Sequence, residues 1–243
     1  MKITEKLAKF DIKRDKRPTI AFIGDSVTQG CFELNVAKDG TFSDVFDYES
    51  VYHNQLKNIL SVLFPHVPVN IINAGIGGDT AKGGLERLER DVLQFNPDLT
   101  VVCFGINDCG VGGDYIDEYE LSLKKMFTAL QKYGSEVIFM TPSMMCTQVS
   151  TLFTNAVAEK FAQIVCDIQR SGSLDRFCNA AKKVAAECGV AVCDVYSKWK
   201  AMQESGVDIN ALLANGINHP IRQMHRLFAY SLIETMFKDG GQI

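Results

Sequence analysis

Short runs of apolar and β-branched residues alternate along the chain with longer segments whose apolar residues recur at helical spacing. Continuous short runs of this kind are typical of strands buried in a parallel sheet. We expect strands at residues 19–23, 67–72, 100–104, 136–140 and 190–195. We expect helices at residues 52–63, about 117–133, about 173–188 and 224–237, and another marked by Leu85, Leu88, Val92 and Leu93. Because helices separate consecutive strands, the pattern predicts an α/β fold with a five-stranded, doubly wound parallel sheet.

Polar residues and glycines directly follow three of the predicted strands. Gly24-Asp25-Ser26 ends the first strand, residues 73–80 follow the second, and Gly105-Ile106-Asn107-Asp108 follows the third. His219 lies in the loop before the last predicted helix. Because the carboxyl ends of parallel strands meet at one edge of a sheet, we expect these segments to converge around a ligand crevice.

Each of these segments also has a simpler interpretation. Gly, Asp and Ser are ordinary residues of turns and helix caps, and Asn107 can also cap a helix. The glycines of residues 75–78 can form a strand-to-helix turn; a phosphate cradle fits less well, because no Lys-Ser or Lys-Thr follows and the spacing is not GxGxxG. His219 can simply be bonded to the backbone of its loop, and His225 is interpreted as structural. Cys109 lies two residues after Asn107 and could be mistaken for a nucleophile. Ser26 is the more plausible nucleophile, because no base can be assigned to Cys109 more plausibly than to Ser26.

Composition narrows the class of protein. The chain has 243 residues, of which 47% are apolar and 22% charged, and we expect one domain spanning residues 1–243. Its net charge of −4 gives no basic face that would favour nucleic acid or an anionic membrane as a partner. We find neither an apolar stretch long enough to span a membrane nor a signal peptide, and we expect a cytoplasmic protein.

The cysteines and histidines do not form a recognisable metal motif. The eight cysteines include no CxxC pair, and we expect reduced thiols, several of them in the core. The four histidines form no HExxH pair, and the spacing of His219 and His225 does not suit a zinc site. We therefore expect no metal or organic cofactor.

Taken together and in order, four segments resemble the SGNH hydrolases, also called the GDSL esterase/lipase family. They are Gly24-Asp25-Ser26, Asn73-Ala74-Gly75-Ile76-Gly77-Gly78-Asp79-Thr80, Gly105-Ile106-Asn107-Asp108 and His219-Pro220. The resemblance implies a three-layer α/β/α fold of the flavodoxin-like type and ester hydrolysis through a covalent acyl-enzyme. It also implies that Ser26 is the nucleophile, His219 the base, and Gly78 and Asn107 oxyanion-hole donors beside the Ser26 backbone N–H.

Elementary chemistry supports these roles. A serine hydroxyl becomes a good nucleophile when an imidazole takes its proton, and the same imidazole can return that proton to the leaving alcohol. The oxyanion that forms needs prealigned donors. Gly78 allows a backbone N–H to approach closely, and the Asn107 amide donates without carrying a charge.

One position departs from the family pattern. The usual acid is an Asp three residues before the histidine, where this chain has Gly216. Three alternatives are open: a Ser26–His219 dyad whose imidazole is held by a backbone carbonyl, an Asn side chain that orients it, or an acid such as Asp208 from elsewhere. We favour the dyad, which predicts a slower enzyme because no carboxylate stabilises the imidazolium.

Substrate choice follows less directly from the sequence. We expect residues 31–50, as a loop, and residues 143–172 to wall the crevice, with side chains Phe32, Glu33, Asn35, Phe42, Phe46, Met144, Met145, Phe153 and Asn155. This mixture favours a small-molecule ester with a short, acetyl-type acyl group and a polar alcohol such as a carbohydrate. The alternatives are a thioesterase or lysophospholipase of the same fold, or a catalytically weak relative that acts as a flavodoxin-like binding module.

Overall fold

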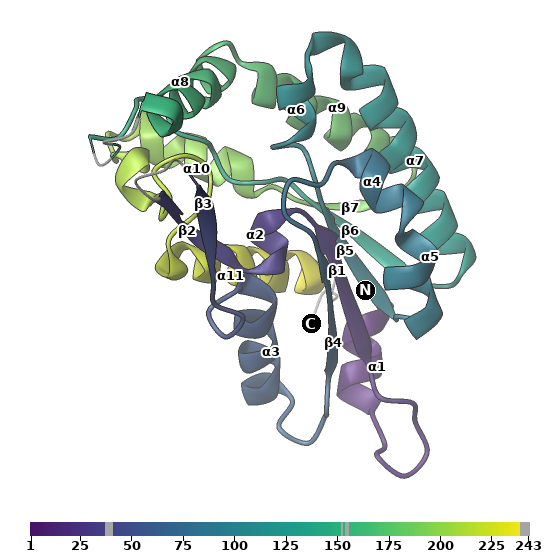
Figure 1. Ribbon diagram of the computed structural model, residues 1–243. Helices are drawn as coiled ribbons and strands as arrows, with labels where there is room; N and C mark the ends of the chain where they lie inside the picture. The colour runs from purple at the N-terminus through teal and green to yellow at the C-terminus, as the bar shows by residue number, and fades with distance from the viewer. Residues whose placement is uncertain (37–40, 152, 154–155, 239–243) are drawn as a thin grey trace.

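The computed structural model describes residues 1–36, 41–151, 153 and 156–238. Its main sheet has five parallel strands in the order β4-β1-β5-β6-β7 (Figure 1). The strands are β1 (Thr19–Gly24), β4 (Asn70–Gly75), β5 (Leu99–Cys103), β6 (Glu136–Met140) and β7 (Ala191–Cys193). This order is that of flavodoxin-like sheets and confirms the predicted fold class.

Helices cover both faces of the sheet and complete the three layers (Figure 1). One layer contains α1 (Lys2–Lys9), α3 (Tyr52–Leu63), α10 (Val195–Glu204) and α11 (Arg222–Phe237). The other contains α4 (Ala81–Glu86), α5 (Leu88–Asp91), α7 (Ile116–Lys132) and α9 (Ser173–Glu187). The remaining helical segments are α2 (Ser26–Gln29), α6 (Asp108–Val111), α8 (Ala156–Arg170), η1 (Leu93–Phe95), η2 (Gly113–Tyr115) and η3 (Ile209–Leu212).

Burial of the strands and helices follows the sequence pattern. All six residues of β1 are buried, as expected for a strand with helices on both faces. In α9, the buried residues Leu174, Phe177, Cys178 and Ala181 recur at the i, i+3, i+4 and i+7 positions of one helix face. The same spacing correctly predicted α3, α7 and α11 to within two residues at each end.

Three predicted elements differ in extent. β4 begins at Asn70, which pairs with Thr19, and not at residue 67; Pro68 has no N–H to give to a sheet ladder. β7 is only three residues long. The helix marked by Leu85 to Leu93 is divided into α4, α5 and η1, and Gly83 and Gly84 give its first part a weak helix propensity.

The prediction of a loop over residues 31–50 is wrong. The described part of this segment contains β2 (Cys31–Val36) and β3 (Phe42–Phe46), which pair as an antiparallel hairpin outside the main sheet (Figure 1). The sequence contains a hairpin signal, since Asp-Gly is a turn-prone dipeptide, but Asp39 and Gly40 themselves lie outside the described residues. The helix α8 within residues 143–172 was also missed, although Ala158, Ala162 and Val165 have helical spacing.

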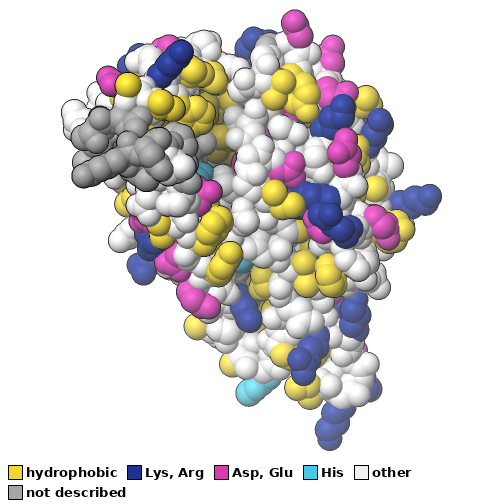
Figure 2. Space-filling model, viewed as in Figure 1, with side chains coloured by type: hydrophobic (Ala, Val, Ile, Leu, Met, Phe, Trp, Pro, Cys, Tyr) yellow, Lys and Arg dark blue, Asp and Glu magenta, His cyan; other side chains and the backbone are white. Residues whose placement is uncertain are grey.

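Charged side chains of both signs are interspersed on the face shown in Figure 2. None of the helices in the described residues is both long and apolar enough to cross a membrane.

The eight cysteines all lie in the described part of the chain. None of them forms a disulfide, and seven are buried.

Candidate active site

Ser26 is presented by the sharp turn between β1 and α2. Gly24 ends β1, and a Cβ at this position would collide with the Thr28 hydroxyl and the Cys103 carbonyl, so glycine is required there. Asp25 caps α2, because its carboxylate accepts the Val27 N–H at 3.0 Å. Ser26 is therefore the first residue of α2, directly beyond the carboxyl end of a central strand.

The structure brings His219 to Ser26 from the opposite end of the sequence. Ser26 Oγ lies 2.8 Å from His219 Nε2. On its other side, His219 Nδ1 lies 3.1 Å from the carbonyl oxygen of Phe32, in β2. Because a carbonyl can only accept, the Nδ1 atom carries the proton and Nε2 is free to accept the Ser26 hydroxyl proton.

A tight turn fixes the backbone of His219. The Asn215 side-chain oxygen accepts the backbone N–H groups of Ile217, Asn218 and His219 at 2.9 to 3.0 Å. The Ala214 N–H donates to the His219 carbonyl at 2.7 Å. This turn positions the histidine through the Asn215 amide and backbone hydrogen bonds.

The geometry distinguishes the three alternatives for the third member of the site. Gly216, at the usual acid position, has a φ of +66°, a backbone angle that residues other than glycine rarely adopt. Asp208 lies eleven residues before the histidine and accepts hydrogen bonds from Asn210. The Asn218 side chain pairs with Asn215. Among the described residues, the hydrogen-bond partner at His219 Nδ1 is the Phe32 carbonyl, which matches the dyad.

The glycine-rich loop after β4 lies beside Ser26. A Cβ on Gly77 would lie 3.9 Å from the Ser26 Cβ. The Gly77 N–H donates to the Gln29 side chain at 2.7 Å, and the Ile76 N–H donates to the Gly24 carbonyl at 3.1 Å. Gly78 follows with φ of +74° in open space. The loop is thus held against α2 by hydrogen bonds, with Gly78 at its exposed end.

Asn107 is tied to the same loop. It follows β5, which neighbours β1, and its Nδ2 donates to the Asp79 carbonyl at 2.9 Å. This bond uses one of the two amide hydrogens and fixes the plane of the side chain. Among the described residues the second amide hydrogen has no acceptor, so it can be donated to a substrate oxygen.

Arg87, which the sequence analysis missed, joins the strand ends beneath this loop. Its guanidinium is buried and donates to the Ala74 carbonyl at 2.6 Å and the Gly24 carbonyl at 3.0 Å. It also forms ion pairs with Asp79 at 2.7 Å and Asp91 at 3.1 Å. Arg87 therefore connects the turn before Ser26 to the loop that carries Gly78. A single arginine between two short helices gives no sequence signal for this role.

Burial sets the protonation of the ionisable groups around the site. It lowers the pKa of His219, which favours the neutral imidazole that a base must be. Burial raises the pKa of both Asp25 and Asp108 to about 7. Burial also raises the pKa of Cys109 to about 12, so this thiol is not a nucleophile at neutral pH.

The side chains expected to line the crevice differ widely in exposure. Phe32, Met144 and Met145 are buried in the core. Phe153 is half-buried, and Asn35 and Phe46 are exposed. Asn155 and the side chain of Phe42 lie outside the described residues. The contribution of residues 31–50 is instead the backbone carbonyl of Phe32, which no side-chain pattern reveals, together with Glu33, which pairs with Arg222.

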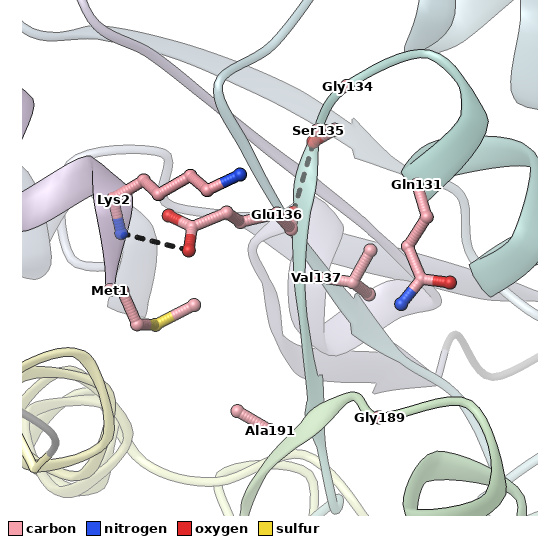
Figure 3. Close-up of a pocket in the computed structure, with 9 residues that line it drawn as sticks. All are labelled: Met1, Lys2, Gln131, Gly134, Ser135, Glu136, Val137, Gly189 and Ala191. Carbon is pink, nitrogen blue, oxygen red and sulfur yellow. Dashed lines mark hydrogen bonds between the residues drawn. The ribbon is translucent and has the colours of Figure 1, made fainter.

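A separate hollow lies at the opposite edge of the sheet. It has a volume of about 480 Å³ and lies at the amino ends of β6 and β7 (Figure 3). Its Glu136 carboxylate accepts the backbone N–H groups of Lys2 at 2.9 Å and Ile3 at 2.7 Å. Glu136 thereby anchors the start of α1 beneath the sheet, and this hollow has no part in the site at Ser26.

The described residues contain no group of three His, Cys, Asp or Glu side chains that could hold a metal ion. The site is built instead from a hydroxyl, an imidazole, an amide and backbone groups.

Comparison with known proteins gives one family and several relatives. The model of the GDSL-like Lipase/Acylhydrolase family matches residues 22–227, which is most of the chain. An acetylxylan esterase from Geobacillus stearothermophilus is 29% identical over 132 residues, 51% of this chain and 58% of that protein. An arylesterase from Vibrio mimicus is 36% identical over 72 residues, 30% of this chain and 36% of that protein. Each match thus covers less than two thirds of the relative.

Solved structures show the same fold over more of the chain. The crystal structure of an acetylxylan esterase from Geobacillus stearothermophilus has a TM-score of 0.63 at 20% identity, covering 93% of this chain and 95% of that one. An α/β hydrolase from the metagenome of Lake Arreo has a TM-score of 0.66 at 21% identity, covering 90% and 94%. At these identities the likeness shows the fold alone.

Proposed function

The chain belongs to the GDSL-like lipase/acylhydrolase family, and from this premise we propose that it is a carboxylic ester hydrolase that uses Ser26 as its nucleophile. The observation that carries the proposal is the 2.8 Å contact between Ser26 Oγ and His219 Nε2. A hydroxyl and a neutral imidazole at this distance are the pair that acyl transfer through serine requires.

Acylation follows from the geometry of the pair. His219 Nε2 takes the Ser26 proton as Oγ attacks the ester carbonyl carbon, and the carbonyl oxygen becomes an oxyanion. The imidazolium then gives the proton to the departing alkoxide, which leaves as the alcohol. Ser26 retains the acyl group as an ester. The Phe32 carbonyl keeps the Nδ1 proton in place throughout.

Deacylation repeats these steps with water. His219 takes a proton from water, the hydroxide attacks the acyl-enzyme, and the proton returns to Ser26 Oγ as the carboxylic acid leaves. In both halves the oxyanion receives hydrogen bonds from the backbone N–H groups of Ser26 and Gly78 and from the Asn107 amide. A single donor of this kind typically contributes about 100- to 1000-fold in rate.

One structural relative offers a comparison for the third member of the site. Structures of catalytic mutants of the Geobacillus acetylxylan esterase carry alanine in place of a serine, a histidine or an aspartate. The aspartate replaced there lies three residues before the histidine. Gly216 occupies that spacing in this chain. We therefore propose that Ser26 and His219 act as a dyad. We expect slower turnover than a triad with a carboxylate would give.

We propose a short acyl group, acetyl foremost, on a polar alcohol such as a carbohydrate. The name of the acetylxylan esterase relative supports this choice. The test is hydrolysis of p-nitrophenyl acetate, butyrate and octanoate, together with acetylated xylooligosaccharides. We expect kcat/KM to fall as the acyl chain lengthens and acetate to be released from the oligosaccharides. A preference for octanoate would contradict the short-acyl proposal and favour a lysophospholipase.

A further inference from the structure

Arg222 connects both strands of the β2–β3 hairpin to the start of α11. Its guanidinium pairs with both carboxylate oxygens of Glu33 in β2, one of them at 3.1 Å. Its Nε donates to Asp47 at 2.7 Å, directly beyond the end of β3. Asp47 is in turn joined to the start of β2, because its N–H donates to the Gly30 carbonyl at 2.9 Å. One side chain thus fixes the two strands relative to each other.

Phe32 lies directly under this ion-pair cluster. The Arg222 guanidinium carbon lies 4.5 Å from the centre of the Phe32 ring, at a distance typical of cation–π contacts. The ring of His225, one turn further along α11, lies 4.6 Å from the Phe32 ring. Phe32 is fully buried between these groups, so its backbone has little freedom while the cluster is intact.

An irregularity in the hairpin turns the Phe32 carbonyl toward the histidine. The pairing of β2 with β3 shifts register between Cys31 and Leu34. Such a bulge releases backbone groups from the ladder and re-aims them, and bulges are frequent beside active sites. The released Phe32 carbonyl accepts from His219 Nδ1 at 3.1 Å. Phe32 and Glu33, which pairs with Arg222, both lie within this irregular stretch between Cys31 and Leu34.

We propose that Arg222 is a positioning residue for the base: by holding Glu33 and Asp47 it fixes the Phe32 carbonyl that orients the His219 imidazole. This rests on the proposed function of His219. A triad acid would orient the ring directly. Here the acceptor is a carbonyl of a two-stranded hairpin, which has only marginal stability on its own. The position of this carbonyl therefore depends on the ion-pair cluster of Arg222, Glu33 and Asp47, which we call the clamp.

The charges in the clamp suit this role. The Glu33 and Asp47 carboxylates neutralise the Arg222 cation, so it does not oppose formation of the imidazolium. The side-chain hydrogen bond from Arg222 lowers the pKa of Asp47 to about 2 and also lowers that of Glu33. Both carboxylates therefore stay ionised at neutral pH, and the clamp persists across the pH range in which His219 works.

The experiment compares Arg222→Gln with Lys198→Gln, which removes another ion pair at α11, that of Lys198 with Glu234. In Arg222→Gln we expect kcat to fall by about 10- to 100-fold with KM within about twofold, because a small misplacement of a catalytic group is costly. Lys198→Gln should leave both constants unchanged. Arg222→Lys keeps the positive charge but lacks the planar guanidinium that pairs with several carboxylate oxygens at once, and it should recover only part of kcat.

A spectroscopic readout separates positioning from simple loss of stability. In ¹⁵N-histidine-labelled Ser26→Ala protein, His219 should show one tautomer with the proton on Nδ1, and adding Arg222→Gln should produce a mixture of tautomers. If Arg222→Gln does not fold, the milder Glu33→Gln serves in its place. An unchanged tautomer, an unchanged kcat, a change confined to KM, or an equal loss in Lys198→Gln would each overturn the proposal. The tautomer measurement needs no turnover, so it is independent of whether Ser26 proves to be the nucleophile.

Discussion

The imidazole of His219 donates its Nδ1 proton to the backbone carbonyl of Phe32 over 3.1 Å. A carbonyl dipole orients the ring as a carboxylate would, but it stabilises a developing imidazolium less than a full negative charge does. The site therefore keeps the correct tautomer while giving up part of the electrostatic assistance of a triad. The consequences for pH, rate and stability can be measured separately.

The first prediction concerns the pH dependence of activity. Burial lowers the pKa of His219 below its usual 6.5. Because only the neutral imidazole is a base, kcat/KM should stay high as pH falls through 6.5 and decline only below it. Asp44→Asn removes a carboxylate whose charge raises this pKa and should move the decline to still lower pH. A midpoint at or above 6.5 in the wild type would contradict the assignment of His219.

The second prediction concerns the oxyanion hole. Asn107→Ala should lower kcat about 100- to 1000-fold, because the amide acts mainly on the charge that forms in the transition state. KM for p-nitrophenyl acetate should change little. Asn58→Ala, on the exposed surface of α3, is the matched control and should behave as wild type. A rise in KM at constant kcat would assign Asn107 to ground-state substrate binding instead.

The third prediction concerns the support beneath the glycine loop. Arg87→Met leaves the Asp79 carboxylate and two backbone carbonyls without their partner, and should lower the free energy of unfolding by about 3 kcal/mol. It should also lower kcat, because the loop that carries Gly78 loses its anchor. Urea denaturation and initial rates measure the two effects. Arg90→Met removes a neighbouring, exposed partner of Asp91 and should alter neither.

The fourth prediction concerns the buried carboxyl of Asp108. Its Oδ1 accepts from the Ala81 N–H at 2.9 Å, its Oδ2 has no partner among the described residues, and burial raises its pKa from 3.8 to about 7. A raised carboxyl pKa means that the folded protein loses stability as pH rises from about 4 to about 7, where the group must ionise. Asp108→Asn removes this penalty.

The difference in unfolding free energy between Asp108→Asn and wild type should therefore grow in favour of the variant between pH 4 and pH 8. The expected change is on the order of 2 to 4 kcal/mol. Asp25 titrates in both proteins and largely cancels in the difference. A difference that is constant with pH would show that Asp108 does not titrate in this range.

Sequence reasoning predicted the parts of the molecule that depend on side-chain pattern. The buried run 136–140 is β6 as predicted, and the spacing of apolar residues located α3 at Tyr52–Leu63. Strand ends in a parallel sheet converge, so the segments that follow β1, β4 and β5 could be expected to meet from periodicity and topology. The pairing of Ser26 with His219, 193 positions away, needed the resemblance to the SGNH hydrolases as well.

The remaining parts depend on contacts that periodicity does not encode. Any residue can supply a carbonyl, so nothing about Phe32 as a residue type indicates that it orients the base. Arg222 pairs with Glu33 and Asp47 at separations of 189 and 175 positions. Single charged residues at such distances give no local pattern, and their pairing follows only from how the β2–β3 hairpin lies against α11.

The most direct test of the account is reaction with a phosphonofluoridate probe, followed by mass spectrometry, alongside turnover of p-nitrophenyl acetate by wild type and Ser26→Ala. The wild type should hydrolyse the ester and gain one adduct, on Ser26. Ser26→Ala should gain none and lose at least about 10,000-fold in kcat while its Tm stays near that of the wild type. Turnover retained by Ser26→Ala, or an adduct on another residue, would contradict the central claim that Ser26 is the nucleophile.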